Sequence, residues 1–243
     1  MNQNVLQGIK IQEKYLHDIE ENGESNIVFA DAIKDLGFSS LDDFFSQKSL
    51  YLMRQALCGN YLHSTTAEIM NLSRRYIQSK EYVVVDADTD ATCVHLGQGK
   101  DTVIDMDYCM EHGIEIYPYD GYGGAIVSGK GDYNLTMVLP DNIDIGAPVV
   151  LNQIKTLLLQ HFNDVEVQGN DVLLDGKKVV GATTAQADGV VFLGFAVSFA
   201  IQPTVVTAVC GTPRTGKQIG NIDPEIYSRE QFKKELLEWL LKP

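Results

Sequence analysis

Apolar runs with a two-residue period flank Asp175-Gly176, and they give the clearest secondary-structure signal in the chain. Asp-Gly between two such runs favours a type I′ turn, so residues 170–182 are predicted to form a β-hairpin. Side chains alternate between the two faces of a strand, so the adjacent Lys177 and Lys178 must point in opposite directions. One lysine is expected to point into solvent, and the other to point from the covered face of the sheet toward the interior.

The N-terminal third of the chain has a different period. Apolar residues recur at helical spacing, and Ser39-Ser40 before Asp42-Asp43 resembles a helix N-cap followed by an acidic first turn. Residues 1–80 are therefore predicted to form a helical N-terminal region that acts as a lid or a partner-binding extension. The predicted helices cover residues 5–19, 27–36, 50–57 and 65–77.

From Glu81 onward the pattern alternates between strands and helices, which places a second domain at residues 81–243. Strands come mostly as hairpins, with helices grouped at residues 106–112, 148–162 and 230–241. This order predicts an α+β fold in which helices cover a largely antiparallel sheet. The predicted strands are 82–85, 91–97, 114–117, 134–139, 165–167, 190–201 and 205–209.

Composition narrows the class of protein. The chain has 243 residues, 44% of them hydrophobic, and a formal net charge of −14. An acidic surface repels phosphates and anionic lipids, so neither nucleic acid nor a membrane is expected as a partner. The N-terminus lacks a secretory pattern, no apolar run is long enough to span a bilayer, and the four cysteines have no CxxC spacing. These features predict a cytoplasmic protein.

Two glycine-containing segments are candidates for ligand binding. Residues 120–132 are the most glycine-dense stretch, and such loops either wrap phosphates and carboxylates or form flexible hairpins. Residues 211–217 fit the spacing of a P-loop, but Gln218 stands where Ser or Thr should bind magnesium and Pro213 lies inside the motif. We interpret the second segment as a basic stretch and not as a P-loop.

Taken together, three segments resemble the lipoate–protein ligase and octanoyltransferase family, within the biotin and lipoate protein ligase superfamily. The first runs from Leu96-Gly97-Gln98 to His112-Gly113-Ile114. The second is the glycine loop, residues 122–132, and the third is the hairpin from Asn170-Asp171 to Gly181. Their order and separations agree with the family across residues 81–228.

The resemblance implies a role for each matching residue. Lys178 takes the position of the family's catalytic lysine, which contacts the acyl carbonyl and the phosphate of an acyl-adenylate. Asp171 matches an aspartate near the adenylate and a metal ion, and Gly123, Gly124 and Ala125 match the backbone that cradles the acyl substrate. Further substrate-binding positions implied by the match are Tyr119, Tyr122, Ser128, Gly131, Asp132, Asn170, Gly181 and Ala182.

The implied reaction uses ATP and Mg²⁺ to activate lipoate, octanoate or a similar acyl acid and attaches the acyl group to a lysine of a lipoyl-type acceptor domain. The chain departs from the family in its glycine loop, where Pro118 and Tyr119 replace two arginines and Asp132 replaces an asparagine. Arginine is a bidentate phosphate ligand. Either Lys130, Arg214 or Lys217 therefore supplies the missing positive charge, or adenylation is weak or absent.

Two alternatives follow from the same residues. Cys210-Gly211 lies where related octanoyltransferases carry a nucleophilic cysteine, so Cys210 and Lys178 are candidates for direct acyl transfer from a carrier thioester. Cys210 is otherwise a small buried apolar residue. The missing arginines also suit a relative that binds a small molecule or a protein partner on this scaffold without catalysis.

Overall fold

The computed structural model describes residues 3–25, 27–57, 60–97, 103–118, 124–141, 143, 146–187, 189–211 and 217–242. The chain divides into two compact units. The smaller unit comprises residues 1–56, 143–145 and 243, and the larger comprises residues 57–142 and 146–242. Among the described residues, no helix combines the length and apolar character needed to cross a bilayer.

The smaller unit contains helices α1 (Gln3–Asn22), α2 (Phe29–Asp35) and most of α3 (Leu41–Leu57). The predicted cap is present, since the Ser40 hydroxyl accepts a hydrogen bond from the Asp43 N–H at 3.1 Å. The core of this unit is aromatic and aliphatic and consists of Val5, Ile33, Phe38 and Phe44. Its role as a lid or a partner-binding extension stays a prediction.

The larger unit is built on a seven-stranded sheet in the order β1-β2-β6-β10-β9-β8-β7. All neighbouring strands are antiparallel except β1 and β2, which are parallel. This arrangement confirms the predicted α+β class. The strands are β1 (Tyr61–Thr65), β2 (Val83–Asp88), β6 (Tyr133–Pro140), β7 (Val165–Gln168), β8 (Asp171–Leu174), β9 (Lys177–Ala187) and β10 (Val190–Val197).

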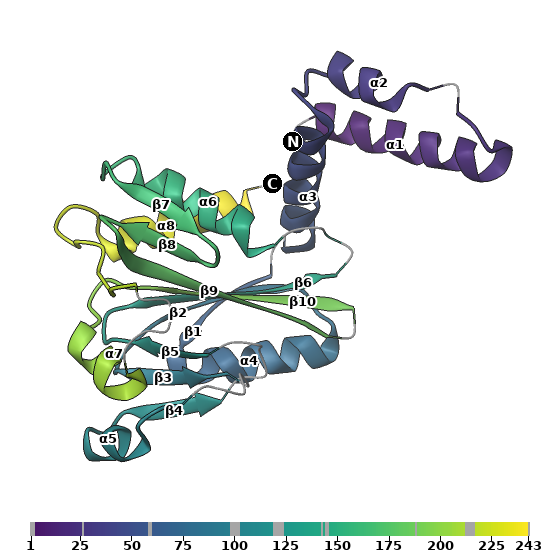
Figure 1. Ribbon diagram of the computed structural model, residues 1–243. Coiled ribbons are helices and arrows are strands. Elements are labelled where there is room, and N and C mark those ends of the chain that lie inside the picture. The colour runs from purple at the N-terminus through teal and green to yellow at the C-terminus, as the bar shows by residue number, and fades with distance from the viewer. Residues whose placement is uncertain are drawn as a thin grey trace. The chain divides into compact units, whose positions relative to one another are not determined.

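Layers cover both faces of this sheet (Figure 1). Helices α6 (Ala147–Leu158) and α8 (Arg229–Leu241) lie on one face, and α4 (Thr66–Ser79) packs on the other against Val83, Val85 and Val138. A three-stranded sheet, ordered β4-β3-β5, lies on the same side as α4. Its strands are β3 (Cys93–Leu96), β4 (Glu115–Pro118) and β5 (Ala125–Ser128), with α5 (Met106–Glu111) and α7 (Pro203–Cys210) beside them.

The sheet-containing unit begins earlier than the domain boundary expected after residue 80. Strand β1 pairs in parallel with β2, from Tyr61 opposite Val84 to Thr65 opposite Asp88, and α4 follows at once. Both elements lie in the larger unit, which starts at Leu57. The helical pattern at residues 65–77 is correct, but its helix covers the sheet because Ile69 packs among sheet residues.

Two predicted elements differ from the structure. Residues 205–209, expected as a strand, belong to helix α7, which begins at Pro203. Proline is favoured in the first turn of a helix, and contacts of Val205, Val209 and Cys210 with α5 and the small sheet outweigh the strand preference of β-branched residues. Residues 125–128 of the glycine segment form strand β5, which pairs with β3.

A charged cluster joins α8 to the sheet on the face opposite α4. The buried Asp86 carboxylate lies 2.8 Å from the Lys233 ammonium and accepts a hydrogen bond from the Tyr61 hydroxyl at 2.9 Å. His63 Nδ1 lies 2.9 Å from the same carboxylate. A buried carboxylate is stable only when it is paired in this way, so the cluster fixes α8 and β1 against β2.

Candidate functional site

The hairpin at the centre of the site has the predicted turn. Asp175 and Gly176 both have positive φ, 50° and 70°, as the two central residues of a type I′ turn require. The hairpin arms are β8 and β9, and the Ala182 N–H donates to the Asn170 carbonyl at 2.7 Å at their open end. This geometry places Asp171 directly opposite Gly181.

A β-bulge in β9 decides which lysine faces the site. Val180 pairs with Val172, but Lys178 pairs with Leu173, so Val179 is an extra residue on this strand. If side chains alternated regularly along the whole strand, Lys177 would lie on the same face of the sheet as Gly181. The bulge shifts this alternation by one residue, so Lys178 lies on that face instead. A Cβ at Gly181 would lie 2.9 Å from both Cε and Nζ of Lys178. The missing side chain of Gly181 therefore makes room for the lysine.

Asp171 holds two ammonium groups at this point. Lys178 Nζ lies 2.7 Å from Asp171 Oδ1, and Lys217 Nζ lies 2.8 Å from Asp171 Oδ2. Lys217 also donates to the Gln168 carbonyl at 3.2 Å. Two ammonium groups and one carboxylate leave one unit of positive charge in a chain whose formal net charge is −14. The cluster is suited to attract an anion.

Lys217 reaches the cluster because its segment pairs with β9. The Lys178 N–H donates to the Gln218 carbonyl at 2.8 Å, and the Gly220 N–H donates to the Lys178 carbonyl at 2.9 Å. Of the two cationic candidates that the structure describes, Lys130 and Lys217, it is Lys217 that lies at Asp171. Lys130 is exposed on the turn between β5 and β6, and Arg214 is outside the described residues.

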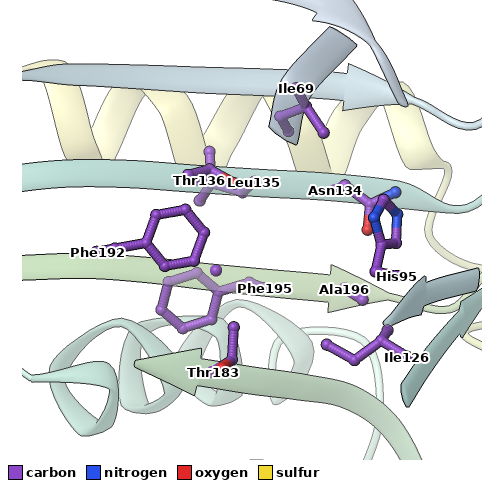
Figure 2. A pocket seen from close by; sticks show the side chains of 11 residues that line it. Ile69, His95, Ile126, Asn134, Leu135, Thr136, Thr183, Phe192, Phe195 and Ala196 are labelled. Atoms are coloured by element: carbon purple, nitrogen blue, oxygen red, sulfur yellow. The ribbon is translucent and has the colours of Figure 1, made fainter. Parts of the chain in front are cut away.

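A mainly apolar pocket lies on the side of the large sheet that faces the small one (Figure 2). Its lining comes from α4, from β3 and β5 of the small sheet, and from β6, β9 and β10 of the large sheet. The lining residues are Ile69, His95, Ile126, Asn134, Leu135, Thr136, Thr183, Phe192, Gly194, Phe195 and Ala196.

Strand register connects the pocket to the lysine. Thr183 pairs with Gly194, and Gly181 pairs with Ala196, so Gly181 is one step along the same face from Thr183. Small residues on β10 keep this surface open: a Cβ at Gly194 would lie 3.0 Å from the Thr183 methyl carbon and 3.2 Å from the Phe192 ring. The Lys178 ammonium therefore lies over a residue that is the direct strand neighbour of Ala196, which lines the pocket.

His95 is a polar residue of the pocket that the sequence patterns did not single out. Its side chain is 5% exposed, and its Nδ1 has no hydrogen-bond partner among the described residues. On the other side of the ring, the Cys93 sulfur lies 3.8 Å from Nε2. Burial lowers the pKa of His95 to about 4 and raises the pKa of the Cys93 thiol to about 12, so both groups are neutral near pH 7.

We expect the neutral imidazole of His95 to make the protein less stable in acid. The pKa of His95 is about 4 in the folded state against 6.5 when unperturbed, so the unfolded state binds more protons between these values. Stability contributed by neutral His95 is complete above pH 6.5 and is lost as the pH falls towards 4. The loss should reach about 3 kcal/mol, and a His95→Leu variant should lack it.

Urea unfolding of the two proteins at pH 7 and at pH 4 measures this difference, because every other titrating group is common to both. Equal losses of unfolding free energy in the wild type and the variant would contradict the assignment.

Asp132 and Ser128, two predicted substrate-binding residues, are buried and hydrogen-bonded within the protein, and their binding to a substrate stays a prediction. Asp132 Oδ1 accepts from the N–H groups of Phe199 and Ala200 at 2.8 Å each, and Oδ2 accepts from the Gly129 N–H at 2.6 Å. Burial raises the pKa of Asp132, and these backbone hydrogen bonds act in the opposite direction. The Ser128 hydroxyl donates to the Asn134 side-chain oxygen at 3.3 Å. Both side chains fix the loop next to the pocket.

Other residues of the predicted glycine cradle are only partly described. Tyr119, Tyr122 and Gly123 lie outside the described residues. Gly124 is exposed, and its carbonyl accepts from the Gly97 N–H at 3.2 Å. Substrate binding by these residues, and by Ala125, Gly131, Asn170 and Ala182, stays a prediction.

Cys210 lies in a setting that does not activate a thiol. It ends helix α7 and packs in a cluster that includes Cys109, Val209 and Ile104. Burial, followed by the nearby Cys109, raises the pKa of the Cys210 thiol, whereas a neighbouring ammonium would lower it. The described contacts thus bring Asp171 and Lys178 together with Lys217, and they place Cys210 in an apolar cluster.

Asp171 is also the predicted metal ligand. Both of its carboxylate oxygens lie against ammonium groups, and the described residues contain no group of three or more His, Cys, Asp or Glu side chains that could hold a metal ion. Proteins usually hold Mg²⁺ through one or two carboxylates together with substrate phosphates. The side chains at Asp171 therefore do not fit a resident magnesium ion.

Comparison with solved structures shows the same fold in lipoate protein ligases. A bipartite lipoate protein ligase from the lipoylation system of Thermoplasma acidophilum, which also includes an E2 lipoyl domain, has a TM-score of 0.61 and 19% identity over 75% of this chain and 82% of that one. A lipoate-protein ligase A bound with ATP has a TM-score of 0.59 and 19% identity over 75% and 84% of the two chains. At this identity the likeness concerns the fold.

Sequence comparison is more specific. A lipoate–protein ligase from Streptococcus pyogenes (serotype M5, strain Manfredo) is 33% identical over 107 residues, which are 42% of this chain and 32% of the relative. The match thus spans about a third of the curated relative's length. A family model described as the lipoyl protein ligase A/B catalytic domain matches residues 71–240. This match includes the small sheet, the large sheet from β2 onward and the hairpin, and the chain therefore belongs to the lipoyl protein ligase A/B catalytic domain family.

Proposed function

We propose that this chain is an acyltransferase of the lipoate–protein ligase type. It binds lipoate or a similar acyl acid, activates the acid with ATP, and transfers the acyl group to a lysine of a lipoyl-type acceptor domain. The observation that carries the proposal is the Lys178 ammonium, held over Gly181, which pairs with Ala196 of the apolar pocket. Relatives support it, since one was solved with ATP and a P. falciparum protein, LipL1, was solved with lipoate.

In this proposal the pocket binds the acyl chain, and the charged cluster at Asp171 binds the carboxylate. The apolar lining takes the acyl chain out of water, and the net positive charge at Asp171 attracts the carboxylate at the chain's end. Lys178 then stabilises the charge that develops on the carbonyl and phosphate oxygens, because a preorganised ammonium in a partly dry site needs little rearrangement. Lys217 supplies a second positive charge, in the absence of arginine at Pro118 and Tyr119.

The reaction proceeds in two steps. The acyl carboxylate oxygen attacks the α-phosphorus of ATP, forming acyl-adenylate as the bond to pyrophosphate breaks. The amine of the acceptor lysine then attacks the acyl carbon, an amide forms, AMP leaves, and the amine loses a proton. Asp171 orients Lys178 in both steps. Magnesium, which the sequence resemblance implies, would have to come with the nucleotide phosphates and not from a preformed protein site.

An acyl-transfer assay tests the proposal. The full chain is incubated with a lipoyl acceptor domain and either lipoate plus ATP or an octanoyl-carrier thioester, and the acceptor mass is measured. We expect modification with the free acid and ATP, and the same rate in Cys210→Ser. Modification by the thioester alone, with loss in Cys210→Ser, would support the thioester route. A failure of both donors, with no binding of lipoate or ATP in calorimetry, would support a non-catalytic relative.

Gly181→Ala should separate activity from stability. The added Cβ would lie 2.9 Å from Cε and Nζ of Lys178 and 3.9 Å from Asp171 Oδ1. Because it meets the flexible end of a side chain, the lysine can move aside and the fold should lose only about 1 kcal/mol or less. The displaced ammonium should lower acyl transfer about tenfold or more, since catalysis is sensitive to small misplacements.

Acyl-transfer rates and urea unfolding of Gly181→Ala and wild type measure the two effects. A variant with unchanged stability and unchanged transfer would show that the position of Lys178 over Gly181 is unimportant.

A further inference from the structure

We propose that the pocket selects an acyl acid whose chain carries a neutral hydrogen-bonding group, and that His95 recognises this group. The inference rests on the proposed function, because it takes the pocket as the site of the acyl chain. It adds a specificity-determining residue and narrows the substrate class from plain alkanoates to polar-substituted acyl acids.

The unpartnered nitrogen of His95 carries the inference. The side chain is 5% exposed, and Nδ1 has no hydrogen-bond partner among the described residues, although the ring lines the pocket. Buried polar atoms are nearly always hydrogen-bonded, because an unsatisfied one loses its interaction with water and gains nothing in return. A ligand group that bonds to Nδ1 would remove this cost, and a plain hydrocarbon chain would leave it in place.

The neighbouring Asn134 side chain, unlike His95, already has hydrogen-bond partners for its amide. The Asn134 side-chain nitrogen donates to the Thr89 hydroxyl at 2.9 Å, and its oxygen accepts from the Ser128 hydroxyl at 3.3 Å. The Asn134 side chain is therefore already engaged within the protein. Figure 2 shows the His95 ring beside Asn134 at the edge of the pocket. His95 differs from Asn134 in that its Nδ1 has no hydrogen-bond partner among the described residues.

Strand register places this group away from the carboxylate. Gly181, under the Lys178 ammonium, pairs with Ala196, and Ala196 pairs with Asn134. Neighbouring strands are about 4.8 Å apart, so Asn134 lies roughly 10 Å across the sheet from Gly181, and the His95 ring of the small sheet lies beside Asn134 (Figure 2). With the carboxylate at Lys178, the hydrogen-bonding group belongs on the outer part of a medium-length chain.

The chemistry of the imidazole defines the group further. Neutral histidine has one N–H and one lone pair, and either can be at Nδ1 depending on the tautomer. A hydroxyl both donates and accepts, so it suits either tautomer. A second carboxylate does not fit, because the ring is neutral and burial penalises an unpaired charge.

Titration calorimetry on the full chain tests the inference with octanoate and with a set of hydroxyoctanoates that carry the hydroxyl on each of the outer carbons. In the wild type we expect at least one hydroxy acid to bind about fivefold more tightly than octanoate, the gain of one net hydrogen bond. In His95→Leu the preference should reverse, because the hydroxyl is then buried without a partner. His112→Leu changes an exposed histidine after α5 and should keep the wild-type preference.

The outcomes separate this inference from the proposed function. Binding of octanoate with the same ratio of affinities in wild type and His95→Leu would overturn the role of His95 and leave the acyl pocket standing. Absence of binding for every acid, lipoate included, in the wild type would overturn the proposed function and this inference with it. A circular dichroism spectrum and melting curve for each variant show that the comparison is made on folded protein.

Discussion

Lys178→Ala is expected to lower acyl transfer at least about 100-fold and to leave the fold intact. Removing one preorganised group that stabilises developing charge typically costs about 3 kcal/mol of transition-state stabilisation, and each 1.4 kcal/mol is about a factor of ten in rate. The Lys178 side chain is 32% exposed, so its ion pair with Asp171 contributes little to stability. The loss should therefore appear in the rate of acceptor modification and not in the unfolding midpoint.

Lys177→Ala is the matched control for this prediction. Lys177 precedes Lys178 in the same strand, but it is exposed and packs its stem near Gly220. Its removal should change acyl transfer less than twofold. If Lys178→Ala and Lys177→Ala transfer acyl groups at the same rate, the proposed catalytic role of Lys178 is incorrect.

Asp132→Ala should destabilise the larger unit by about 3 kcal/mol or more. The change leaves three backbone N–H groups, those of Gly129, Phe199 and Ala200, without their acceptor in a site where Asp132 is 2% exposed. Each buried donor left unsatisfied costs about 1–3 kcal/mol. The variant should consequently unfold at a much lower urea concentration, and acyl transfer should fall because the loop next to the pocket is no longer fixed.

Asp132→Asn provides a graded comparison, since its one remaining carbonyl oxygen can accept some of these hydrogen bonds. Asp141→Ala, at an exposed aspartate after β6, should change stability by no more than about 0.5 kcal/mol. If Asp132→Ala were as stable as Asp141→Ala but inactive, Asp132 would act on the substrate and not on the loop.

Several parts of the fold could be predicted from local sequence. Asp175-Gly176 defines its own turn because both residues tolerate positive φ, and the apolar periods on either side set the two arms. The helix at residues 147–158 begins close to Pro148 and buries the apolar stripe that its sequence shows. In these segments, the local backbone preference and the burial of the apolar side chains favour the same secondary structure.

Other parts could not be predicted, because distant contacts outweigh local preference. The valines of α7 favour a strand by propensity, yet they form a helix against α5 and the small sheet. Strand β1 is five residues long, and it exists because it pairs in parallel with β2, more than twenty residues later. His95 reads as one polar residue in a strand, and only its position between two sheets makes it a pocket residue.

Sequence patterns were enough to predict the α+β class, the hairpin, the pair of adjacent lysines and the resemblance that points to Lys178. Which lysine faces the site follows only from the folded chain, because a single extra residue at Val179 shifts the alternation of side chains. Folding also brought Lys217 to Asp171 from 46 residues away and tied Asp132 to backbone N–H groups across the fold. Short-range preferences fix turns and periods, whereas strand register and burial assign each side chain its neighbours.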